Sequence, residues 1–304
     1  MILPPPLQIG DTIGITSTAR KINSDELQFA IEFLNQKGFK IKLGSCIGLE
    51  DHQFAGTDEE RITSINELIL DPTVKAILCA RGGYGSVRIV DGINWQALQN
   101  TPKWICGYSD VTVLHARLNQ IGMASLHSTM PVNFKSNSAP ALNSFVSALL
   151  GKPLSLNAET HKLNITGQAT GQLVGGNLSI LYSLLGSQDQ LDTADKILFI
   201  EDLDEYLYHI DRMIQALKRA GMLDHLAGLV IGGMSHMNDN AIPFGHSAVQ
   251  TIANTVKEFK YPVAFNFLVG HLDDNRTLAL GAEYGLVVGE NSGLTPLPLR
   301  DISP

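Results

Sequence analysis

Short apolar runs alternate with amphipathic segments of helical length along the first half of the chain. Apolar runs of strand length occur at 12–17, 39–44, 74–80 and 104–109. Segments with apolar positions three and four residues apart follow most of them, at 25–37, 61–70 and 111–121. This alternation predicts an α/β fold in which a parallel sheet is covered by helices on both faces.

Several polar residues directly follow these predicted strands. Ser17, the segment 81–85 and Ser109 each stand at the end of an apolar run. Ligands of open parallel sheets bind beyond the carboxyl ends of the strands. The pattern therefore predicts that these three positions are neighbours at one edge of the sheet.

The pattern changes between residues 136 and 166, where Ser, Asn and Pro become frequent. We interpret 136–166 as a crossover between an N-terminal domain of residues 1–135 and a C-terminal domain of residues 167–304. The second domain opens with a strand, a glycine turn and a helix over 171–187. It continues with apolar runs at 196–202, 227–234, 261–267 and 278–288.

Composition excludes several classes of protein. The 304 residues carry a net charge of −8 and no run of Lys or Arg, which argues against nucleic acid as a partner. No apolar stretch is long enough for a membrane span, and the N-terminus lacks the pattern of a secretory signal. The three cysteines show no CxxC spacing, which favours the reducing cytoplasm: Cys46, Cys79 and Cys106.

The stretch CGYSDVTVLH predicts a strand that ends on Gly107, with Ser109 at the bend into a helix. A serine at this place commonly caps the helix. It can also be a nucleophile presented on a tight strand–turn–helix elbow. The stretch alone leaves both interpretations open.

The stretch ARGGYGSVRIVD carries glycines at 82, 83 and 85 between a strand and a helix. It matches neither nucleotide-binding glycine pattern, and it can be an ordinary connecting turn. The glycines also allow backbone N–H groups to point outward as an anion-binding nest. Beside Ser109, such a loop would donate hydrogen bonds to an oxyanion or a substrate carboxylate.

Two further strand ends carry ionisable side chains. Glu201 ends a strongly apolar strand, so its carboxylate needs a partner, either in a structural ion pair or as the group that orients a histidine. His271 follows a strand and a glycine in a polar loop, where many histidines are simply solvated. Ser109, Glu201 and His271 together supply a nucleophile, an orienting acid and a base. Because they come from different halves, the prediction places the site between the two domains.

The nine histidines show no paired spacing typical of a metal site, so we expect no catalytic metal. The alternative from a different class is a catalytically silent protein that binds a ligand on a similar sheet. Retention of all three catalytic residue types argues against it.

The motifs GYSD (107–110), FIEDLDE with Glu201, and GHLDDN (270–275) resemble those of the LD-carboxypeptidase family of serine peptidases. The opening LQIGDTIGITSTA and the RGGYG turn are similar to it as well. The resemblance runs in the same order from about residue 7 to residue 290. A second glycine after the serine, as in α/β-hydrolases, is missing.

The resemblance implies a flavodoxin-like parallel-sheet N-terminal domain and a smaller C-terminal α/β domain. It implies Ser109 as nucleophile, Glu201 as orienting acid and His271 as base in a cytoplasmic homodimer without metal or cofactor. The expected reaction releases the terminal D-alanine of a murein tetrapeptide during cell-wall recycling; the alternative within the family is amide hydrolysis of a microcin C-type peptide–nucleotide. The backbone N–H of Asp110 and one from the turn Gly82, Gly83 and Tyr84 are expected to bind the oxyanion. Arg81 is one candidate to bind the terminal carboxylate of the peptide.

Overall fold

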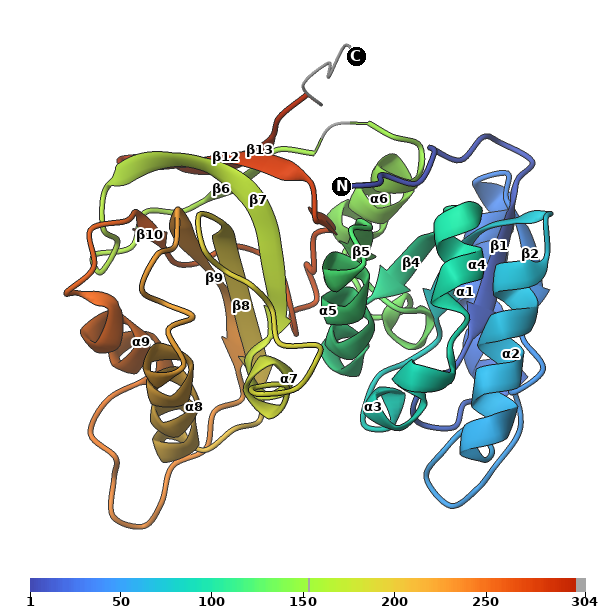
Figure 1. The fold of residues 1–304 in the computed structure, drawn as a ribbon, viewed down its shortest axis with the longest axis horizontal. Coiled ribbons are helices and arrows are strands. Elements are labelled where there is room, and N and C mark those ends of the chain that lie inside the picture. The colour runs from blue at the N-terminus through green and yellow to red at the C-terminus, as the bar shows by residue number, and fades with distance from the viewer. Residues whose placement is uncertain (153, 299–304) are drawn as a thin grey trace. The chain divides into compact units, whose positions relative to one another are not determined.

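The computed structural model describes residues 1–152 and 154–298, and the chain forms two compact units (Figure 1). Unit 1 comprises Met1–Lys152 and Asp273–Ala279. Unit 2 is described over 154–272 and 280–298. Each unit combines helices with a sheet that contains neighbouring parallel strands, so the predicted α/β class is confirmed.

Unit 1 is built on a six-stranded sheet with strand order β11-β5-β4-β3-β1-β2. The five strands from the N-terminal half pair in parallel. Their carboxyl ends therefore meet at one edge, as the sequence predicts. The strands are β1 (Thr12–Thr16), β2 (Lys40–Leu43), β3 (Val74–Cys79), β4 (Trp104–Gly107), β5 (Ser125–His127) and β11 (Leu278–Leu280).

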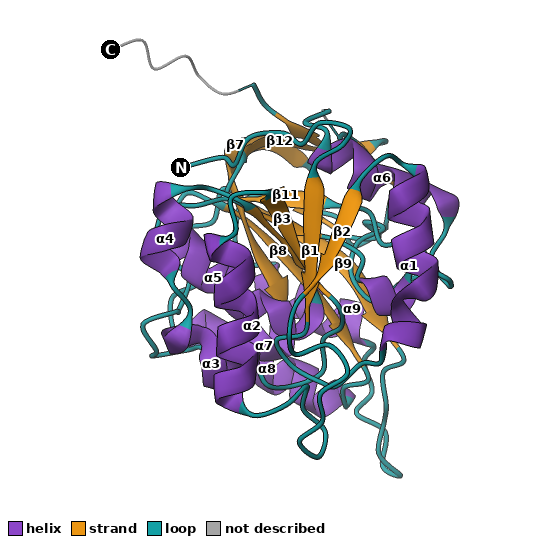
Figure 2. Ribbon diagram, turned by 90° about the vertical axis from the view of Figure 1, so that its right-hand side faces the viewer, coloured by secondary structure: helices purple, strands orange, loops and turns teal. Residues whose placement is uncertain are grey.

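Helices cover both faces of this sheet. Figure 2 shows α1 and α6 on one side of the strands and α4 and α5 on the other. On the first side, Leu27, Ala30 and Leu34 of α1 join a buried cluster with apolar residues of the strands. The helices are α1 (Ser24–Gln36), α2 (Asp58–Leu70), α3 (Ser86–Ile89), α4 (Trp95–Asn100), α5 (Thr112–Gln120) and α6 (Ala139–Leu149), with short 3₁₀ turns η1 (Val90–Gly92), η2 (Ser109–Val111) and η3 (Pro131–Asn133).

Unit 2 has a seven-stranded sheet with order β10-β9-β8-β7-β12-β13-β6. Strands β7 to β10 are parallel, whereas β12, β13 and β6 are antiparallel additions. Figure 1 shows how the long β7 curves within unit 2. The strands are β6 (Leu156–Ala158), β7 (Gly167–Asn177), β8 (Ile197–Leu203), β9 (Gly228–Ser235), β10 (Val263–Ala264), β12 (Glu283–Val288) and β13 (Ser292–Pro296).

The described part of unit 2 has the helices α7 (Leu178–Ser183), α8 (Leu207–Arg219) and α9 (Ala248–Val256). In α8, Ile210, Met213, Ile214 and Leu217 are buried, with the spacing of an amphipathic helix. Helix α8 packs along α9. Among the described residues, no helix combines the length and apolar character needed to cross a membrane.

Two differences from the sequence-based expectations concern how the chain is divided between the two units and their sheets. The segment 136–166, expected to lie between the domains, is divided: α6 belongs to unit 1 and β6 to unit 2. The expected strand 278–288 is two strands that join different sheets, because Gly281 between them takes a φ of 90°. At that φ a glycine bends the chain where other residues are strained.

Candidate active site

Ser109 lies at the junction between β4 and a helical turn. Strand β4 ends at Gly107, and η2 begins at Ser109, which is partly exposed. Its φ is +63°, a left-handed conformation that costs a non-glycine residue about 1–3 kcal/mol. A simple helix cap has an extended backbone, whereas Ser109 lies inside the turn itself. The local conformation therefore favours the elbow over the cap.

The glycine turn touches this elbow. A Cβ atom built on Gly82 would lie 3.0 Å from the Cβ atom of Ser109 and 3.1 Å from its Oγ atom. Within the described chain, the backbone N–H groups of Gly82, Gly83 and Tyr84 donate to no protein acceptor. Gly83 and Tyr84 are exposed. The turn thus brings Gly82 close to the Ser109 hydroxyl, and its backbone N–H groups are available as hydrogen-bond donors.

Asp110 contributes more than the backbone N–H that the sequence suggested. Its side chain is 1% exposed, and its Oδ2 atom accepts a hydrogen bond of 2.8 Å from the Ser86 N–H. Burial raises the pKa of the Asp110 carboxyl, against the lowering effect of hydrogen bonds from Ser86 and Gly85. Nothing in the GYSD stretch itself points to this link.

Arg81 lies next to the glycine turn and is partly exposed. Its Nη1 atom donates a hydrogen bond of 3.1 Å to the Lys21 carbonyl oxygen and lies 3.9 Å from Glu26 Oε1. Its role toward a substrate carboxylate stays a prediction.

In unit 2, Glu201 and His271 meet although they are far apart in sequence. The His271 Nδ1 atom lies 2.7 Å from Glu201 Oε2, which also accepts the His271 backbone N–H at 3.2 Å. Because an ionised carboxylate only accepts hydrogen bonds, Nδ1 carries the proton. The neutral ring then has its basic lone pair on Nε2, the tautomer that a general base needs.

The surroundings of His271 favour the charged imidazolium. Burial alone would lower the pKa of His271, but the negative charge of Glu201, its hydrogen bond and the charge of Asp202 together raise it above the usual 6.5. Glu201 itself is fully buried, and its Oε1 atom has no hydrogen-bond partner among the described residues. A buried carboxylate of this kind is costly without a cationic partner. The pair is thus poised to stabilise a proton on His271.

A glycine allows this pair to form. Gly270 has a φ of +105°, and a Cβ atom built on it would lie 2.6 Å from both the Cβ and the Oε2 atoms of Glu201. The backbone before His271 therefore runs directly against the carboxylate. Only glycine fits that approach.

Asp202 is a buried acid whose importance the sequence did not reveal. It belongs to β8 and is 1% exposed. It accepts hydrogen bonds from Asn177 Nδ2 and the Ser179 N–H, both at 2.9 Å. Burial, with the Glu201 charge, raises the pKa of Asp202 to about 7. The apolar run before it was the available signal, because it places Asp202 on the strand.

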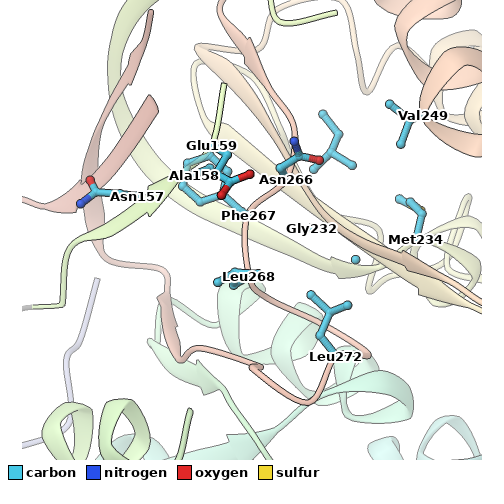
Figure 3. A pocket seen from close by; sticks show the side chains of 12 residues that line it. Asn157, Ala158, Glu159, Gly232, Met234, Val249, Asn266, Phe267, Leu268 and Leu272 are labelled. Carbon is cyan, nitrogen blue, oxygen red and sulfur yellow. The ribbon is translucent and has the colours of Figure 1, made fainter. Parts of the chain in front are cut away.

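Unit 2 also contains a cavity of about 590 Å³ (Figure 3). One wall is Ile231–Met234 of β9, and the loop with Leu268 and Leu272 forms another. Asn157, Glu159 and Asn266 supply its polar side chains. Because Leu272 follows His271, this cavity and the Glu201–His271 pair share one loop.

Among the described residues, no group of three or more His, Cys, Asp or Glu side chains is arranged to hold a metal ion. An α/β fold, a strained serine elbow and a carboxylate-bound histidine define a protein suited to hydrolysis.

Comparison with known proteins agrees with this class. Residues 13–128 match the model of the LD-carboxypeptidase N-terminal domain, and residues 170–286 match that of the LD-carboxypeptidase C-terminal domain. The chain belongs to the LD-carboxypeptidase family, and it is a carboxypeptidase. The family expected from the sequence motifs is thereby confirmed.

Individual relatives cover almost the whole chain. A probable murein peptide carboxypeptidase of Bacillus subtilis (strain 168) is 32% identical, covering 96% of this chain and 93% of the relative. The microcin C7 self-immunity protein of Escherichia coli is 26% identical, covering 94% and 93%. The crystal structure of muramoyltetrapeptide carboxypeptidase from Oxalobacter formigenes is similar with a TM-score of 0.88 and 27% identity, covering 94% of this chain and 99% of that one.

Proposed function

We propose that this protein is a serine-type LD-carboxypeptidase that hydrolyses the L,D-amide bond of a murein tetrapeptide and releases the terminal D-alanine. In this proposal Ser109 is the nucleophile, His271 the base and Glu201 the orienting acid. The observation that carries it is the 2.7 Å hydrogen bond between His271 Nδ1 and Glu201 Oε2. That bond fixes the imidazole tautomer that a serine nucleophile requires.

The proposed reaction has two stages. His271 Nε2 takes the proton of the Ser109 hydroxyl while Oγ attacks the scissile carbonyl carbon. The N–H groups of Asp110 and of the glycine turn stabilise the oxyanion. His271 then protonates the leaving amine of D-alanine, and a water molecule hydrolyses the acyl-enzyme by the same route.

The substrate class is proposed from the relatives. Those named for murein peptide and muramoyltetrapeptide carboxypeptidase activity match nearly the full chain. The same proposal includes the cytoplasm as location and a homodimer as the active form, both implied by the family resemblance. Light scattering of the purified protein tests the homodimer, and cell fractionation tests the location.

A second candidate is amide hydrolysis of a peptide–nucleotide. It is favoured by Tyr206 and Tyr208, which are 44% and 39% exposed and whose ring centroids lie 5.7 Å apart. They stand at the start of α8, shortly after Glu201 in the chain. Exposed aromatic rings of this kind can stack on a nucleobase.

The deciding experiment is mass spectrometry of purified murein tetrapeptide after incubation with the protein. We expect loss of one alanine, and no loss from the matched peptide that ends in L-alanine. A parallel reaction uses an aminoacyl sulfamoyl adenosine. Cleavage of that compound alone would replace the first function by the second, and cleavage of neither would reject both.

A further inference from the structure

The Asp110 carboxylate connects two segments that are distant in sequence. Its Oδ2 atom accepts the N–H of Ser86, the first residue of α3, at 2.8 Å. Ser86 directly follows the glycine turn 82–85, and Asp110 directly follows Ser109. Hydrogen bonds to this carboxylate therefore tie the end of the turn to the serine elbow.

Helix capping alone does not account for this buried acid. Helix α3 has only four residues, and a buried carboxylate is expensive. The Oδ1 atom of Asp110 has no hydrogen-bond partner among the described residues. Capping a four-residue helix does not explain a buried carboxylate with one unpartnered oxygen. Asp110 must therefore have a further role.

The far side of the same turn is held by a buried cation. Arg61 is fully buried, and its Nη1 atom donates to the carbonyl oxygens of Thr18, at 2.7 Å, and Gly85, at 3.1 Å. The Thr18 and Ser86 hydroxyls lie 2.8 Å apart. These contacts fix where the turn starts its helix, but they do not reach Ser109. Among the described residues, the hydrogen bonds that join the end of the turn to the elbow go to the Asp110 carboxylate.

We infer that Asp110 is a positioning residue that locks the two oxyanion donors of the proposed mechanism to each other. Its backbone N–H is one donor, and its side chain holds the segment that carries the other. This inference rests on the proposed function. Oxyanion donors act on the charge that develops in the transition state, and correct placement matters to a fraction of an ångström.

The test compares Asp110→Ala with Asp110→Asn. Asparagine keeps an oxygen that can accept the Ser86 N–H, whereas alanine keeps none. Loss of one oxyanion donor costs about 10²–10³ in kcat, so we expect kcat of Asp110→Ala to fall by about 10²-fold with KM nearly unchanged. Asp110→Asn should stay within about tenfold of the wild type. Asp110→Leu fills the volume without an acceptor, and it replaces the alanine variant if that variant does not fold.

Asp91→Ala is the matched control. It removes an acid of unit 1 that is mostly exposed and pairs with Arg117 at 2.8 Å. Its kcat and KM should remain at wild-type values. An equal loss of kcat in this control and in Asp110→Ala would overturn the inference, because the loss would then follow from any removed acid.

Hydrogen exchange separates this inference from the proposed function. In Asp110→Ala, amides of the segment 80–91 should exchange faster, while Asp110→Asn and Asp91→Ala should match the wild type. Modification by a fluorophosphonate, in which the Ser109 hydroxyl passes its proton to the base His271, Oγ bonds to phosphorus and fluoride leaves, should slow in the alanine variant alone. If the wild type does not cleave murein tetrapeptide, the proposed function fails. Hydrogen exchange and the modification rate still test the positioning role of Asp110 in that case. Unchanged exchange or an unchanged modification rate in Asp110→Ala would overturn the positioning role.

Discussion

Two groups of residues serve the proposed mechanism, and different forces hold them. Ser109 is held by its backbone conformation, with a φ of +63° between β4 and α5, and by close contact with Gly82. The adjacent residue Asp110 adds a buried hydrogen bond from the Ser86 N–H. The Glu201–His271 pair is held by an ionic hydrogen bond between residues 70 positions apart. The first group depends on steric fit, and the second depends on charge.

This contrast predicts different sensitivities. No group in the serine elbow needs to change its charge near neutral pH, so steric changes should affect it most. The Glu201–His271 pair has a pKa that its own charges have shifted, so pH and charge-removing substitutions should affect it most. Experiments that apply each kind of change to each group can break or sharpen the comparison.

The largest effect is expected from Ser109→Ala. Removing the hydroxyl removes the nucleophile, and turnover should fall by about 10⁴-fold or more. Alanine keeps the Cβ atom, so the thermal melt should stay near that of the wild type. Turnover of D-alanine release measures the effect, and near-wild-type hydrolysis by a pure sample would falsify the assignment.

The next effect concerns Glu201 and His271 as a unit. Glu201→Gln cannot hold the required tautomer and should lower kcat by about 10²–10⁴-fold. Combined with His271→Ala, it should add little to the loss from His271→Ala alone. The double-mutant cycle uses variants with matching thermal melts. If the two losses multiply, Glu201 is a structural acid and does not act through the imidazole.

The third effect is a pH dependence confined to the charged pair. His271 must be neutral to accept a proton, so kcat/KM should fall about tenfold per pH unit below its pKa, which lies above the usual 6.5. Glu201→Gln should move this limb to lower pH. The raised pKa also stabilises the folded protein fully below the unfolded value of about 6.5, and this stabilisation is lost as pH rises through the folded value. If the acidic fall of kcat/KM stays at the same pH in Glu201→Gln, the group that titrates is not the Glu201–His271 pair.

The smallest effect is a steric test of the serine elbow. Gly82→Ala places a methyl group 3.0–3.1 Å from the Ser109 side chain, which must give way by a few tenths of an ångström. We expect a loss in kcat of about tenfold, without a shift of the pH limb. Gly289→Ala, where nothing lies within 4 Å, is the matched control. If Gly82→Ala shifts the pH dependence of kcat/KM, the separation into a steric group and a charged group is contradicted.

Local sequence predicted the positions of the serine and of the strand ends well. The elbow at Ser109 follows from an apolar strand, two small residues and a helix, all within ten positions. Glu201 and His271 were predicted at strand ends, but their 2.7 Å contact depends on the order of β8 and β9 and on the approach of Gly270. The hydrogen bond of the Asp110 carboxylate could not be predicted from the sequence, because tertiary packing brings its partner Ser86 next to it.

The return of the chain to unit 1 through Asp273–Ala279 has a consequence for biosynthesis. Strand β11 is an outer strand of the unit 1 sheet, yet it is made after most of unit 2. Residues 1–152 emerging from a ribosome therefore carry β5 with one unpaired edge, a surface open to pairing with other chains. That edge stays open for more than a hundred further residues of translation, until residue 280 has left the exit tunnel. Truncated products that stop before β11 should for this reason be far more prone to aggregate than the full chain.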